Sequence, residues 1–92
     1  MAVTSDKIAA VTRVLRRHGA TRIVLFGSAL ESPETARDVD IAVDGIQGWA
    51  IFRAGAEAEK ILGMPLDLVP LSPPTRFTRY IEKKGRVVYE RG

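Results

Sequence analysis

The stretch DVDIAV at residues 38–43 decides the fold, because apolar and polar side chains alternate along it. Successive side chains of a β-strand point to opposite faces, so Val39, Ile41 and Val43 share one face. Asp38 and Asp40 then share the other face. The alternation predicts a half-buried strand, with helices packed on its aliphatic face and an open, acidic face opposite.

The segments on both sides of this strand alternate between helical and extended patterns. Apolar residues recur at helical spacing in residues 5–18, 49–62 and 75–84. Short runs of strand length occupy residues 21–26, 65–69 and 87–89. We therefore predict an α/β (α+β) domain with a small mixed sheet of three to four strands and helices packed on one face.

Length and composition limit what such a domain can be. The chain has 92 residues, which predicts one domain over residues 1–92 and leaves no length for a second lobe. It contains no cysteine, which excludes disulfides and thiolate zinc sites. No apolar run approaches the length of a membrane span, so we expect a cytoplasmic protein with no membrane partner. The net charge of +3 is mild and does not by itself indicate nucleic acid.

The acidic face of the central strand is costly unless it binds a cation. Asp38 and Asp40 lie about 7 Å apart along a strand, and two such charges repel by roughly 2 kcal/mol at an effective dielectric of about 20. Asp67 stands between Leu66 and Leu68, so it emerges on the same side if the leucines pack on the helices. Mg²⁺ prefers one or two carboxylates together with substrate phosphates. The three aspartates are therefore candidate ligands for Mg²⁺ or Mn²⁺.

Gly27 and Ser28 follow the first strand directly and are candidate phosphate-binding residues. A glycine lets the backbone approach a phosphate closely, and backbone N–H groups at the start of a helical turn attract anions. The serine hydroxyl adds one more donor. The alternative is structural, because Ser28-Ala29-Leu30-Glu31 matches the pattern of a helix capping box.

These motifs, taken in order, resemble the nucleotidyltransferase superfamily of DNA polymerase β. The resemblance rests on the strand end LFGS at 25–28, on DVD at 38–40, and on Asp67 within LDLV at 66–69. The short chain, with GRVVYE at 85–90, is similar to the minimal branch, the antitoxin nucleotidyltransferases that accompany HEPN-domain toxins. The resemblance extends from the first helix to the last strand.

The resemblance implies a nucleotidyltransferase fold and a Mg²⁺-dependent transfer of a nucleoside monophosphate, AMP from ATP, to an acceptor hydroxyl. Asp38, Asp40 and Asp67 are then the catalytic and metal-binding residues, and Gly27 and Ser28 bind the nucleotide. The implied acceptor is a hydroxyl on a HEPN-domain toxin, which the protein modifies as an antitoxin.

Two residues depart from the family pattern. Ala29 occupies the position after the serine where the family commonly has arginine, and Glu31 places an acid near the expected phosphates. They keep an alternative open, in which a catalytically decayed antitoxin inhibits its toxin by contact only. A further alternative is a nucleotidyltransferase acting on a small molecule or a nucleic-acid end, in which a homo-oligomer could form the cleft.

Basic residues gather on two predicted helices. Arg13, Arg16 and Arg17 share a face of the first helix, and a second group on the third helix consists of Arg76, Arg79 and Lys83. Such groups are commonly solvated faces, and the functional alternative is a contact surface for a partner or a nucleic acid.

Overall fold

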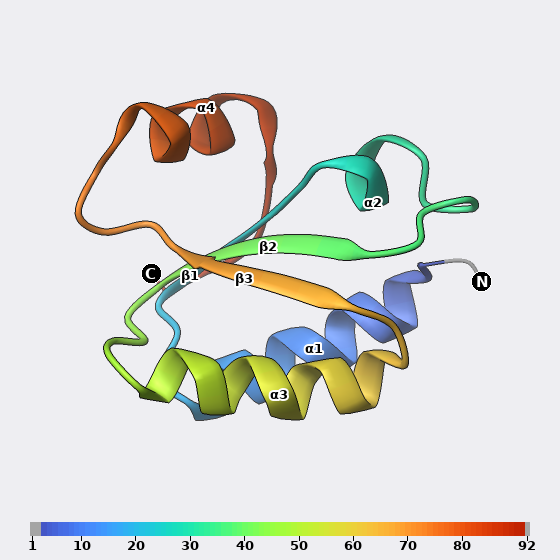
Figure 1. Cartoon of the computed structure of the whole chain (residues 1–92), viewed down its shortest axis with the longest axis horizontal. Helices are drawn as coiled ribbons and strands as arrows, with labels where there is room; N and C mark the ends of the chain where they lie inside the picture. Colours follow the sequence, from blue (N-terminus) through green and yellow to red (C-terminus); the bar gives the residue numbers. More distant parts are fainter. Residues whose placement is uncertain (1–2, 92) are drawn as a thin grey trace.

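Four strands form one mixed sheet in the order β3-β2-β1-β4 (Figure 1). Strand β1 is antiparallel to both of its neighbours, β2 and β4, whereas β2 and β3 are parallel. The strand bounds are β1 Arg22–Phe26, β2 Val39–Asp44, β3 Leu66–Pro70 and β4 Arg86–Glu90. This computed structural model describes residues 3–91, so the predicted domain limits at residues 1 and 92 lie outside the described residues.

Helices α1 (Ser5–Arg17) and α3 (Ala50–Leu62) lie side by side beneath the sheet in Figure 1. Helix α1 begins after Thr4, whose side chain accepts a hydrogen bond from the Lys7 N–H. Helix α3 ends at Gly63, which adopts the left-handed conformation with φ +77°. Within residues 3–91, no helix is both long and apolar enough to cross a bilayer.

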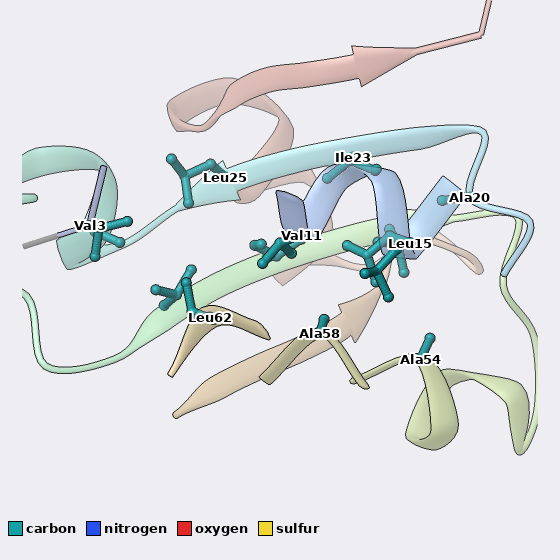
Figure 2. Close-up of a cluster of buried hydrophobic side chains, with 14 of the residues drawn as sticks. Val3, Val11, Leu15, Ala20, Ile23, Leu25, Ala54, Ala58 and Leu62 are labelled. Carbon is teal, nitrogen blue, oxygen red and sulfur yellow. The ribbon is translucent and has the colours of Figure 1, made fainter. Parts of the chain in front are cut away.

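The main hydrophobic core lies between these two helices and the sheet (Figure 2). Helix α1 contributes Val11, Val14 and Leu15, and helix α3 contributes its own buried stripe of Ala54, Ala58 and Leu62. The aliphatic side chains of β2 meet them, since Val39, Ile41 and Val43 are all buried in this cluster. The face predicted from the alternation in residues 38–43 is therefore the one that the helices cover.

A second, smaller core covers part of the opposite face of the sheet. It consists of Val24, Phe26, Ala42, Leu71 and Ile81. Ile81 comes from helix α4 (Arg76–Lys84), which lies above the sheet in Figure 1. Phe77 of the same helix meets Phe26 edge to face, with ring centroids 6.0 Å apart.

The predicted fold class is confirmed as α+β, with one difference in the placement of the helices. Helices were expected on one face only, but α4 packs on the other. The reason is that β1 and β2 are the two central strands and carry apolar residues on both faces. Val24 and Ala42 are fully buried on the side away from α1 and α3, and only a covering helix removes them from water.

Candidate active site

Two of the three predicted aspartates face each other across neighbouring strands. Asp40 of β2 and Asp67 of β3 are register partners in the parallel pair, so their side chains leave the same face of the sheet. That face is opposite to the one where Ile41 is buried. Asp38 lies one residue before β2, at the same end of the strand, and is exposed.

Asp40 is the carboxyl of this group whose surroundings change its protonation. Partial burial raises the pKa of the Asp40 carboxyl, and the negative charges of Asp38 and Asp67 raise it further. No ion pair within residues 3–91 joins any of the three to a basic side chain. The negative charge of these three carboxylates is therefore not neutralised by an ion pair within residues 3–91.

Gly27 places the backbone of the loop after β1 next to the Asp40 carboxylate. It follows β1 with φ +76° and ψ −156°, a combination that is essentially restricted to glycine. A side-chain carbon built on Gly27 would collide with the Asp40 carboxylate. The absence of a side chain therefore lets the loop after β1 approach Asp40 closely.

Ser28 begins the single-turn helix α2 (Ser28–Glu31) and is exposed. The residue that caps this helix is Gly27, and no side chain makes a capping hydrogen bond. The capping-box alternative for Ser28 and Glu31 is therefore wrong. The Ser28 hydroxyl has no hydrogen-bond partner among residues 3–91, which leaves it available to a ligand.

The two residues that depart from the family pattern lie in different surroundings. Ala29 is 2% exposed and belongs to the main core, so its side chain does not point toward a ligand. Glu31 is exposed at the end of α2. The position after Ser28 thus serves packing in this chain.

Known structures resemble this chain in fold. No established family profile matches the sequence, and no curated protein matches it at the sequence level. A solved structure of a candidate minimal nucleotidyltransferase is 26% identical, with a TM-score of 0.73, over 94% of this chain and 95% of that one. The chain has the minimal nucleotidyltransferase fold.

Two other solved structures share this fold at lower identity. A toxin–antitoxin complex with AMP-PNP contains a chain that is 23% identical, with a TM-score of 0.74, over 92% of this chain and 72% of that one. The tri-AMPylated Shewanella oneidensis HEPN toxin in complex with MNT antitoxin contains one that is 20% identical, with a TM-score of 0.71, over 91% and 70%. At these identities the likeness concerns the fold alone.

The carboxylates of this site suit a metal only if phosphate oxygens complete its ligand set. Among residues 3–91, no three His, Cys, Asp or Glu side chains are gathered closely enough to hold a metal ion by themselves. Mg²⁺ needs only one or two carboxylates when phosphate oxygens supply further ligands.

A groove beside Asp67 was not identified from the sequence. It has a volume of about 250 Å³ and runs between α3 and β3, lined by Ile51, Phe52, Gly55, Ala56, Glu59, Leu66, Asp67 and Leu68. At the start of α3, Trp49 and Phe52 are 84% and 69% exposed, with ring centroids 5.7 Å apart. The sequence offered one sign of this groove, the aromatic pair Trp49 and Phe52. Only the tertiary structure shows that both side chains are exposed.

Proposed function

We propose that this protein transfers AMP from ATP to a hydroxyl group on a partner protein, using Mg²⁺ or Mn²⁺. The observation that supports it most directly is the pairing of Asp40 with Asp67, in the field of Asp38 and against the backbone of Gly27. Carboxylates next to a glycine loop suit a metal-bound triphosphate.

In this proposal each residue of the site has a separate role. Asp38 and Asp40 hold the metal that comes with the triphosphate, and Asp67 completes the ligand set from the neighbouring strand. The backbone at Gly27 and the Ser28 hydroxyl bind the phosphate oxygens. A bound divalent metal supplies charge neutralisation on the triphosphate and lowers the barrier to attack.

The reaction exchanges one phosphorus–oxygen bond for another. The acceptor oxygen forms a bond to the α-phosphorus, and the bond from that phosphorus to the bridging oxygen of the β-phosphate breaks. Pyrophosphate leaves with the negative charge. The proton of the acceptor hydroxyl passes to a carboxylate, for which Asp67 at the exposed edge of the site is the proposed group.

The proposed partner is a HEPN-domain toxin, which makes this chain its antitoxin. The support is the shared fold, since one structure with this fold contains AMP-PNP and another pairs an MNT antitoxin with a tri-AMPylated HEPN toxin. An acceptor placed by a partner also meets a physical need. Correct positioning of two reactants contributes on the order of 7–11 kcal/mol at best. Residues 3–91 form a single sheet with its covering helices, so a docked partner would supply that positioning.

The groove between α3 and β3 is the proposed place where the acceptor protein docks. Asp67 forms part of its wall, so an occupant of the groove reaches the edge strand that carries this carboxylate. Trp49 and Phe52 offer the exposed aromatic surface that commonly anchors protein interfaces.

The test combines nucleotide binding with labelling of the partner. Calorimetry should detect ATP binding with Mg²⁺ and none in EDTA. ATP radiolabelled at the α-phosphate should leave label on a HEPN-domain partner protein. The double variant Asp38→Asn, Asp40→Asn should abolish both results. The matched control, Asp44→Asn, removes a charge from the same strand and should preserve them.

Three other results would contradict this proposal or point to a different function. Equal ATP affinity in EDTA would contradict the metal-dependent mechanism. Tight inhibition of a HEPN-domain partner without label would establish an antitoxin that acts by contact only. Label on RNA, DNA or a small molecule in the absence of any protein partner would overturn the antitoxin function and indicate a different nucleotidyltransferase.

A further inference from the structure

A basic hollow lies on the helical face of the sheet, at the end remote from the aspartates. It has a volume of about 470 Å³ and is lined by Arg13, Arg16, Arg17, Gly19, Ala20, Tyr89 and Arg91. Three of the arginines come from α1, and the fourth follows β4 at the other end of the chain. We call this surface the arginine hollow.

The arginine hollow is separate from the active site. Its floor residue Ala20 precedes β1, and Gly27 of the active site follows the same strand. The five residues of β1 span about 17 Å. The two sites also use opposite faces, because Ala20 and Tyr89 pack with the main core, whereas Asp40 faces away from it. The hollow therefore does not bind the triphosphate of the proposed reaction.

Most of the positive charge in the arginine hollow is not neutralised by the protein. In the described part of the chain, Arg17 alone among these arginines has an ion-pair partner, Glu57, at 2.7 Å. Within residues 3–91, Arg13, Arg16 and Arg91 form no ion pair with a carboxylate. No acidic residue lines the hollow.

The nearest acid in the sequence is directed elsewhere. Glu90 precedes Arg91 but pairs with Arg22, which also pairs with Glu82 of α4. Side chains alternate along β4, so Glu90 leaves the opposite face from its neighbour Tyr89. The structure thus keeps this carboxylate out of the hollow.

Tyr89 adds an aromatic ring to the lining of the arginine hollow. The guanidinium carbon of Arg16 lies 4.3 Å from the centroid of the Tyr89 ring, which is half-buried. This stacking holds the guanidinium in place with its donors available. A fixed guanidinium matches the oxygens of a phosphate, and arginine and tyrosine planes are the surfaces on which unpaired bases stack.

We propose that the arginine hollow binds the phosphate backbone of single-stranded RNA. Its four basic groups are all arginines and come from two segments that surround one depression, so several phosphates of one strand can be bound together. A strand also provides bases to stack beside Arg16 and Tyr89. The proposal is independent of the reaction proposed above.

The test is fluorescence anisotropy with a labelled, unstructured 12-nucleotide RNA at 50 to 300 mM KCl. Three to four phosphate contacts on a single strand predict a log–log salt slope of about −2 to −3. The triple variant Arg13→Gln, Arg16→Gln, Arg91→Gln should weaken binding on the order of 100-fold at 0.1 M salt, because each contact contributes about fivefold there.

A charge-matched control separates the arginine hollow from a general effect of net charge. Arg76→Gln, Arg79→Gln, Lys83→Gln removes the same three charges from α4 and should change the affinity less than about threefold, an effect of distant, screened charges. Thermal unfolding checks that both variants fold. Equal weakening by both triple variants would overturn the proposal, as would absence of binding by the unmodified chain. A four-nucleotide RNA that binds as tightly as the 12-mer would also overturn it.

Discussion

The two faces of the sheet differ in how completely they are covered. In the described chain, the main core beneath the sheet contains sixteen buried residues, and the second core above it contains five. Burial of apolar side chains is the main source of folding free energy. The face covered by α1 and α3 therefore carries most of the stability, and the other face is left with room for charged groups.

Neighbouring residues of one strand show the difference most directly. Ile41 is 1% exposed and lies in the main core, whereas Asp40, the residue before it, lies on the opposite face beside Asp67. A strand thus places a structural and a chemical side chain one position apart. Substitutions on the two faces should separate stability from function.

The largest loss of stability is expected from Ile41→Ala. Removing a fully buried isoleucine side chain costs about 2–5 kcal/mol, a large part of the stability of so small a domain. Urea unfolding measures the loss. The matched control is Ile61→Ala, since Ile61 is 48% exposed and should contribute within about 0.5 kcal/mol. Equal losses for both variants would show that the helical face does not dominate stability.

Gly27→Ala should affect both stability and the site. Its backbone conformation costs about 1–3 kcal/mol for any other residue, and the new methyl group displaces the Asp40 carboxylate. We expect lower stability together with weakened Mg²⁺-dependent ATP binding.

The control for Gly27→Ala is Gly63→Ala. Gly63 has nearly the same φ, +77°, but a side chain there meets nothing within 4 Å. It should lose about 1–2 kcal/mol of stability and keep its nucleotide affinity. Unchanged ATP binding in Gly27→Ala would mean that the approach of this loop to Asp40 has no part in the site.

Asp40→Asn should stabilise the protein slightly while abolishing metal-dependent nucleotide binding. The folded state raises the pKa of Asp40, so it holds more protons than the unfolded state, and stability falls as pH rises from the usual Asp value, about 3.9, through the raised one. Asparagine removes this cost. The gain should be below about 1 kcal/mol at pH 7 and vanish below the usual Asp pKa, by urea unfolding across pH. A loss of stability at pH 7 would make Asp40 a structural residue.

The smallest effect is expected from Glu57→Gln, which breaks a contact between α1 and α3 on the covered side. Hydrogen bonds from His18, at 2.8 Å, and from Arg17, at 2.7 Å, lower the pKa of Glu57. A lowered pKa contributes stability that is complete above the usual Glu value and is lost as pH falls through the lowered value.

Because the Glu57 side chain is 42% exposed, its contribution should be small and should weaken with added salt. Unfolding midpoints of the two proteins from pH 7 down to pH 2, at low and high salt, test this expectation. A difference that does not shrink toward low pH, or that persists in high salt, would require a cause other than the ion pairs.

The sequence predicted the elements of this fold closely, because their patterns are local. The predicted strand at 38–43 is found at Val39–Asp44, and the predicted helix at 49–62 is found at Ala50–Leu62. The apolar residues on either side of Asp40 and Asp67 predicted that both side chains leave the same face of the sheet. The register of β2 and β3 places the two residues opposite each other. Their catalytic roles stay a prediction.

The placement of α4 could not be predicted in the same way. Its own pattern shows that it is amphipathic, but not which face of the sheet its apolar side meets. The answer depends on the order β3-β2-β1-β4, which makes β1 and β2 central and requires cover for Val24 and Ala42. The capping-box pattern at Ser28 failed for a related reason, because the loop geometry at Gly27 caps the helix instead.

The sequence alone thus determined which residues lie in helices and strands and which side chains share a face, since these follow from periodicities of a few residues. Only the tertiary structure decided which distant residues meet. Gly27 lies against Asp40, Glu57 binds Arg17 and His18, and Arg91 joins the arginines of α1. Such contacts depend on strand order and on the packing of helices, and no pattern within one segment specifies either.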